Sequence, residues 1–185
     1  ITECHRQLEP FCDAMELNIS SPNTEGLRIF QEPTKLRSLL AEVNQSRTKP
    51  LLVKMPPYKS DEGDHEKTLN LGRICLEEKV ESLTVSNTIP IAHDGLAVGH
   101  GGLSGNPLFE NTLAMVKTYH SEFGDSIEIN ACGGISNGYQ AYEALKAGAS
   151  SIQILTALIY QGPRVVQKIN KELSELITNK GNPKN

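Results

Sequence analysis

The chain has 185 residues, of which 38% are hydrophobic and 22% charged, with 10 prolines and 15 glycines. This composition excludes a disordered or collagen-like protein, and the length suffices for one domain with a buried core or for part of a larger one. With 18 basic and 22 acidic residues the formal net charge is −4, which argues against a nucleic-acid partner. No apolar run reaches the about 18 residues that a membrane-spanning helix needs, and the first five residues lack the pattern of a targeting segment.

Five short segments are predicted as buried strands: residues 14–19, 51–55, 82–86, 127–131 and 151–155. Most are rich in branched apolar residues, as in parallel strands that are covered on both faces. Helical spacing of apolar residues separates or follows them, at Leu36, Leu39, Leu40 and Val43 and again at Val165, Ile169, Leu173 and Ile177. A further helix is predicted to begin at an Asn137 cap and to stop at Gly148. This alternation predicts an α/β fold with a parallel sheet.

Two architectures use such units, a closed (β/α)₈ barrel and an open doubly wound sheet. No G-x-G-x-x-G opens a helix after the first strand, which weakens the dinucleotide-binding form of the open sheet. Every predicted strand runs into a polar or glycine-rich stretch, which favours the barrel because barrels place their chemistry on those loops. A barrel takes about 250 residues and eight strands, so we expect residues 1–185 to be the C-terminal five βα units of one barrel domain, with the first units absent from this sequence.

Two glycine-rich loops are candidates for phosphate binding. Residues 133–138 lie between a strand and a helix, and residues 99–105 precede another helix. Exposed backbone N–H groups at a helix N-terminus suit a phosphate. An ordinary left-handed turn with a helix cap is the alternative, and the presence of two such loops favours the phosphate.

Lys54 and a set of asparagines are the polar residues that stand out at the strand ends. Lys54 lies in an apolar strand, where it is costly to bury unless it meets an anion or an electron-rich group such as reduced flavin; the alternative is a lysine that extends to solvent. Asn18, Asn23, Asn87 and Asn130 recur near strand ends and suit a planar polar ring, although turn formation is the better explanation for any single one of them.

The cysteines and histidines do not suggest a metal site. Cys4, Cys12, Cys75 and Cys132 form no C-x-x-C pair, and reduced thiols are the expectation. His93 and His100 lie in a long polar stretch that is predicted to be a mobile lid. Ser21, in the polar run at residues 20–24, could act as a nucleophile or base, but no neighbouring histidine or aspartate in the sequence obviously activates it.

At this point five motifs, in order, resemble the dihydroorotate dehydrogenase family: residues 18–28, 53–54, 86–88, 101–105 and 133–136. The resemblance extends from about Asp13 to about Glu172. Serine at position 21, where the class 1 enzymes carry cysteine, is similar to the class 2, quinone-reducing branch. The family fold is an FMN-containing (β/α)₈ barrel, in agreement with the alternation.

The resemblance implies oxidation of dihydroorotate to orotate in pyrimidine (UMP) biosynthesis, with FMN as cofactor. It implies that Ser21 removes the C5 proton while hydride leaves C6 for the flavin, and that Thr24 helps to carry the proton away. The residues implied to hold the pyrimidine are Asn18, Asn23, Asn87 and Thr88. Those implied to bind FMN are Asn18, Lys54, Ser86, Ser104, Gly105, Gly133, Gly134, Leu155 and Thr156. Leu155 departs from the family, which often has tyrosine there, and Asn106 replaces a usual basic residue.

The class 2 resemblance further implies quinone as the electron acceptor. It implies a peripheral location on the bacterial or mitochondrial inner membrane, through segments absent from this sequence. Two alternatives stay open. One is another FMN barrel acting on a dihydropyrimidine or dihydrouridine, although no cysteine cluster for an iron–sulfur partner is present. The other is an inactive partial barrel, because five strands leave the edges of the sheet open.

Overall fold

The computed structural model spans the chain and describes all residues except 22–23, 25, 58–61, 181 and 184–185. Its centre is a five-stranded sheet in which every neighbouring pair is parallel. The strands are β1 (Met15–Asn18), β2 (Leu51–Lys54), β3 (Ser82–Val85), β6 (Glu128–Cys132) and β7 (Ser151–Gln153), in the order β1-β2-β3-β6-β7. The predicted parallel α/β fold is confirmed: four of the strands are shorter than predicted at one end or both, and β6 is displaced by one residue.

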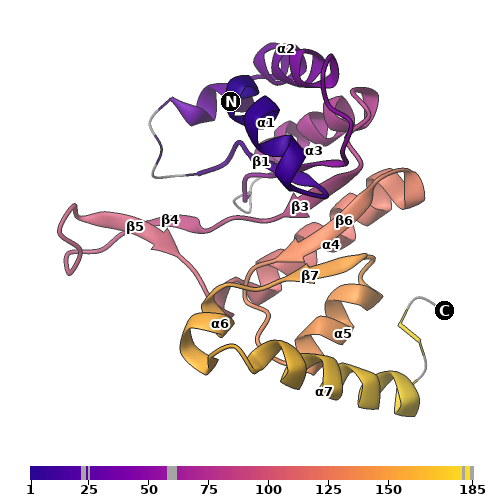
Figure 1. The fold of residues 1–185 in the computed structure, drawn as a ribbon. Helices are drawn as coiled ribbons and strands as arrows, with labels where there is room; N and C mark the ends of the chain where they lie inside the picture. The colour runs from indigo at the N-terminus through magenta and orange to yellow at the C-terminus, as the bar shows by residue number, and fades with distance from the viewer. Residues whose placement is uncertain (22–23, 25, 58–61, 181, 184–185) are drawn as a thin grey trace.

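Helices cover the apolar face of this sheet (Figure 1). The helices of the described residues are α1 (Thr2–Leu8), α2 (Pro33–Asn44), α3 (Glu62–Glu77), α4 (Phe109–Phe123), α5 (Gly138–Lys146), α6 (Thr156–Gln161) and α7 (Val165–Lys180), with 3₁₀ turns at Glu9–Phe11, Leu27–Gln31, Asn106–Leu108 and Gly124–Ser126. The predicted stripe of α2 is buried throughout, whereas in α7 only Val165 and Ile169 are buried. The core therefore lies between helices and strands, as a barrel requires.

The predicted helix between β6 and β7 has the expected signals at both ends. The Asn137 side chain accepts a hydrogen bond from the backbone N–H of Gln140 at 2.9 Å, which caps α5. Gly148, with φ +112°, follows the helix and donates its N–H to the Leu145 carbonyl at 3.0 Å. Cap and stop fix where the chain enters α5 and leaves it, and hence how the β6–α5 loop meets the sheet.

The inner face of the sheet is polar and joins strands that are not neighbours. Gln153 Nε2 on β7 donates to Glu16 Oε2 on β1 at 3.1 Å and to Thr84 Oγ1 on β3 at 3.2 Å, and Thr84 donates to the same Glu16 carboxylate. These side chains come from the first, third and fifth strands of the sheet. Layers built from alternate strands fill the interior of a (β/α)₈ barrel. The sheet is therefore curled like a barrel wall, with its two edge strands in side-chain contact.

The long polar stretch around His93 and His100 forms a hairpin and not an irregular loop. Strands β4 (Ile89–Ala92) and β5 (His100–Leu103) pair antiparallel, with Ile89 opposite Leu103, and the hairpin extends away from the sheet (Figure 1). The expectation of a loop over residues 99–105 was wrong because glycine and proline, which are poor strand formers, concealed the pairing. His100 begins β5, and His93 lies in the connecting turn, where its backbone N–H donates to the Gly99 carbonyl at 2.9 Å.

The Glu9 carboxylate, at the opposite end of the sheet, forms hydrogen bonds with nearby backbone groups. The buried Glu9 carboxylate accepts the backbone N–H groups of Thr48 and Lys49, the latter at 3.0 Å. These hydrogen bonds, that from Thr48 most of all, hold the pKa of Glu9 below its usual value. Glu9 therefore fixes the turn that leads into β2.

Three features of the described residues bear on partners and cofactors. All four cysteines are free thiols. In the part of the chain that the structure describes, no group of three histidine, cysteine or acidic side chains is placed to bind a metal ion. No helix among those same residues combines the length and the apolar character needed to cross a membrane.

Candidate active site

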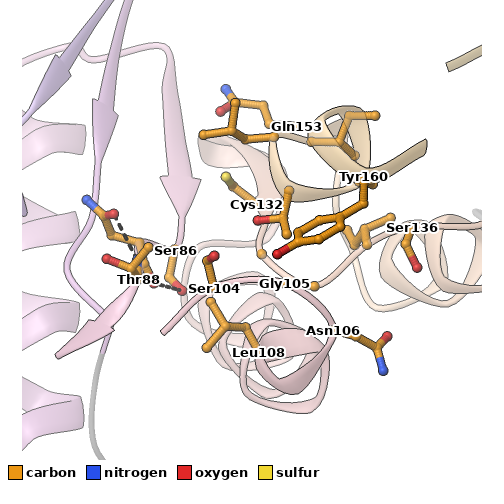
Figure 2. A pocket seen from close by; sticks show the side chains of 18 of the residues that line it. Ser86, Thr88, Ser104, Gly105, Asn106, Leu108, Cys132, Ser136, Gln153 and Tyr160 are labelled. Carbon is orange, nitrogen blue, oxygen red and sulfur yellow. Dashed lines mark hydrogen bonds between the residues drawn. The ribbon is translucent and has the colours of Figure 1, made fainter. Parts of the chain in front are cut away.

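A cavity of about 270 Å³ lies at the carboxyl ends of β2, β3, β6 and β7, where barrels carry their active sites (Figure 2). Its volume is near the lower end of the range for small-molecule sites, about 300–1,000 Å³. Ten of the residues singled out from the sequence line it: Lys54, Ser86, Asn87, Thr88, Ser104, Gly105, Gly133, Gly134, Leu155 and Thr156. Segments far apart in the chain thus converge on one space.

Lys54 ends β2 and is half-buried in this cavity, as its unusual strand position predicted. Its Nζ lies 3.5 Å from the Cys132 Sγ on β6. Burial raises the pKa of the Cys132 thiol, and the neighbouring ammonium only partly offsets that effect. The cavity floor therefore presents a cation beside a protonated thiol.

Three glycines of the cavity lining have positive φ angles: Gly105 (+81°), Gly133 (+131°) and Gly134 (+76°). At Gly134 a Cβ would lie 2.6 Å from the Cα of Phe109 and closer still to its backbone nitrogen. The loop thus packs directly on the start of α4, which a side chain would prevent. This geometry satisfies both interpretations made from the sequence, the phosphate loop and the ordinary turn.

A cluster of amides and hydroxyls links the cavity to the loop after β1. Asn87 Nδ2 donates to the Ser20 Oγ at 2.8 Å and to the Asn18 Oδ1 at 3.3 Å. The Asn87 Oδ1 accepts the backbone N–H of Thr88 at 2.8 Å. The structure therefore brings Asn18, Asn87 and Thr88 together, as expected of residues that share one ligand.

Ser21 and Thr24 lie on the same loop but are not among the cavity-lining residues. The Thr24 Oγ1 donates to the Ser21 Oγ at 3.1 Å, so the two predicted catalytic side chains are in contact. Asn23, the remaining predicted pyrimidine ligand, lies outside the described residues. Asn130 does not join the site: it lies within the sheet, where its Nδ2 donates to the Ser82 Oγ at 2.8 Å.

Several cavity residues were missed from the sequence. Cys132 and Gln153 line the cavity from the inner face of β6 and β7, and the Tyr160 ring lies across it from Ser86 and Thr88 (Figure 2). Two-residue alternation along the strands is a signal that could have identified Cys132 and Gln153. Tyr160, which is 86% exposed on α6, had no such signal.

A curled parallel sheet with a cavity at the carboxyl ends of its strands defines a (β/α)₈-barrel protein with a small-molecule site, of which this chain forms five strands. The family model described as dihydroorotate dehydrogenase matches residues 1–177. The chain therefore belongs to the dihydroorotate dehydrogenase family, whose enzymes are flavin-dependent oxidoreductases.

Relatives and solved structures agree with this assignment. The dihydroorotate dehydrogenase (quinone) of Rhodococcus opacus is 39% identical over 182 residues, covering 94% of this chain and 50% of the relative. The mitochondrial dihydroorotate dehydrogenase (quinone) of Arabidopsis thaliana is 32% identical, covering 94% and 40%. A crystal structure of the Eimeria tenella enzyme in complex with ferulenol superposes with a TM-score of 0.86 at 28% identity, covering 99% of this chain and 55% of that one. The chain spans about half the length of the curated relatives it matches.

Proposed function

We propose that this chain forms the flavin- and pyrimidine-binding part of a dihydroorotate dehydrogenase that oxidises dihydroorotate to orotate in pyrimidine biosynthesis and passes the electrons to a quinone. The observation that carries the proposal is the convergence of ten residues of the family's motifs on one cavity, with the amide cluster at its margin. The match of the family model to residues 1–177 supports it.

The residues of the cavity fit FMN. The Lys54 ammonium is available to balance negative charge on a reduced flavin ring, and Ser86 lies in the same lining. Ser104, Gly105, Gly133, Gly134, Leu155 and Thr156 would hold the ribityl chain and phosphate, with the side-chain-free backbone of the glycines open to close approach. When bound, FMN would supply the two-electron acceptor that the side chains themselves lack.

The amides would hold the pyrimidine. Asn18, Asn87 and Thr88 offer donors and acceptors without charge, which suit the carbonyl and N–H groups of a pyrimidine ring and its carboxylate. Asn23 would join them from the same loop, and Asn18 would also reach the flavin. Such uncharged donors and acceptors, from the loops after β1 and β3, would orient a planar ring at the edge of the cavity.

Ser21 would act as the base that takes the C5 proton of dihydroorotate. A serine hydroxyl is a weak base, so its own proton must leave as the C5 proton arrives. The Thr24 Oγ1 lies 3.1 Å from the Ser21 Oγ, and the Thr24 hydroxyl, once turned to accept, would take the proton that Ser21 gives up while it loses its own to the surroundings. Thr24 would then relay the proton outward, since it is exposed.

An exposed apolar surface on α6 supports an apolar electron acceptor. Leu155, Ile159 and Tyr160 are 69%, 72% and 86% exposed, and Leu155 and Tyr160 also line the cavity. Such a surface beside a redox site suits a quinone better than a charged acceptor. Because quinones of this kind dissolve in membranes, we place the protein at the periphery of the bacterial or mitochondrial inner membrane.

The test is anaerobic mixing of the FMN-loaded complete protein with dihydroorotate, followed at the oxidised-flavin absorbance band. Rapid loss of the band is expected. If the flavin binds but stays oxidised, the substrate is not dihydroorotate, and a dihydropyrimidine or dihydrouridine reductase becomes the preferred function. A colourless protein that also refuses added FMN would identify an inactive partial barrel.

A further inference from the structure

Ser20 joins two of the asparagines that are proposed to hold the pyrimidine, Asn18 and Asn87. Its side chain is buried, with 5% of the residue exposed. The Ser20 Oγ accepts from the Asn87 Nδ2 at 2.8 Å and donates to the Asn18 Oδ1 at 3.2 Å. Asn18 ends β1 and Asn87 follows β3, two strands that β2 separates in the sheet. The hydroxyl therefore connects loops that the sheet itself does not hold together.

These contacts fix which way each amide faces. The Asn18 Oδ1 accepts from the Ser20 N–H at 3.1 Å, from the Ser20 hydroxyl and from the Asn87 Nδ2. Turning the Asn18 amide by half a revolution would set its NH₂ group against the N–H of Ser20 and the NH₂ of Asn87. The Asn87 amide is held at both ends, by Ser20 at its nitrogen and by the Thr88 N–H at its oxygen. Asn18 is thereby left to present its NH₂ group, a donor, to a ligand.

We infer that Ser20 is a positioning residue of the pyrimidine site: its hydroxyl, together with the Asn87 amide that it holds, fixes Asn18 in the orientation that presents the Asn18 NH₂ group to a carbonyl or carboxylate oxygen of the ligand. This inference rests on the proposed function. Ser20 would act through the two amides and not by touching substrate or flavin. Only a hydroxyl can accept from one amide and donate to the other at this place, since alanine does neither and a thiol does both weakly.

The chain offers a matched control at the other end of the sheet. Ser82 begins β3, is 6% exposed, and its Oγ accepts from the Asn130 Nδ2 at 2.8 Å. Ser82→Ala therefore removes a buried serine hydroxyl with the same kind of partner and the same distance, but far along the strand from the cavity. Any general cost of losing such a hydroxyl appears in both variants.

The experiment measures the Kd of orotate by titration calorimetry on the FMN-loaded complete protein, together with KM and kcat for dihydroorotate. Loss of the two hydrogen bonds in Ser20→Ala is expected to raise the Kd and KM about 10-fold, with kcat changed much less. Ser20→Thr, which keeps the hydroxyl, should restore binding. Ser20→Cys, in which the side chain is close in size to serine, should weaken orotate binding to a similar extent. This variant replaces Ser20→Ala in the experiment if the alanine variant does not fold.

Each outcome decides a different question. Orotate binding by Ser20→Ala or Ser20→Cys that equals the wild type would overturn the positioning role, as would an equal loss in Ser82→Ala. A fall in kcat without a rise in KM would also overturn it, because the amides would then not be the groups affected. A wild-type protein that holds FMN but binds no orotate would instead refute the proposed function.

Discussion

Gly134 offers the most direct test of how the cavity is built. It lies in the loop between β6 and α5, lines the cavity and has a φ of +76°. Substitution by alanine places a Cβ 2.6 Å from the Cα of Phe109, a residue that is 8% exposed and begins α4. Backbone cannot rotate aside as a side chain would, so either the loop or the helix must move.

The loss of stability in Gly134→Ala has two contributions, and a second glycine, Gly26, allows one of them to be measured alone. Gly26 has nearly the same φ, +75°, but a Cβ there would meet no atom of the described residues within 4 Å. Gly26→Ala therefore carries only the penalty of an L-residue in the left-handed region, about 1–2 kcal/mol. Gly134→Ala adds the overpacking cost of about 1–3 kcal/mol, for a total of about 2–5 kcal/mol. That sum is a large part of the about 5–15 kcal/mol by which domains are stable.

Urea unfolding of the two variants measures these terms, and FMN affinity reports on the cavity. Gly134→Ala is expected to lower the free energy of unfolding by about 1–3 kcal/mol more than Gly26→Ala does. It is also expected to weaken FMN binding, because the loop that contains Gly134 lines the cavity. If the two alanine variants lose the same stability, the close packing of the loop on Phe109 is not what requires glycine, and the reasoning fails.

Two further predictions concern the proton chemistry and the acid stability. Ser21→Ala should slow flavin reduction by dihydroorotate about 100-fold or more while orotate still binds, and stopped-flow reduction at a near-normal rate would remove Ser21 from its role. The pKa of Glu9 is lowered in the folded chain from its usual 4.5, so its stabilising effect is present above that value and is lost as the pH falls through the lowered folded pKa. Thermal unfolding of Glu9→Gln should therefore change less than that of the wild type between about pH 5 and pH 3, and parallel curves would contradict this.

Local signals were sufficient to predict the elements that build the barrel wall. The helical stripe of α2 and the Asn137 cap of α5 are properties of a few neighbouring residues, and both were predicted correctly. Lys54 was conspicuous because a cation interrupts an apolar strand, and the structure places it in the cavity. Such signals work because burial and capping depend on spacing along the chain.

The hairpin and the cross-strand contacts could not be predicted in this way. Gly101 and Gly102 pair in β5 through backbone groups, which nearly every residue type carries and which leave no side-chain pattern. The contact of Lys54 with Cys132 joins residues that are 78 positions apart. Ser20, similarly, connects to Asn87 across 67 positions. Contacts of this kind depend on the order and curvature of the strands, which become known only from the folded sheet.

The alternation of inward and outward side chains along β2 builds the core and also determines which side chain points into the cavity. Val53 and Met55 are fully buried on either side of Lys54, so a shift of β2 by one residue would bury the ammonium among the helices and expose two apolar side chains in the cavity. Burying an unpaired ammonium costs several kcal/mol, more than the local sequence could recover. The apolar residues of the strand therefore specify where the functional cation points. Substitutions in the core that loosen the register of β2 should for this reason weaken FMN binding before they unfold the chain.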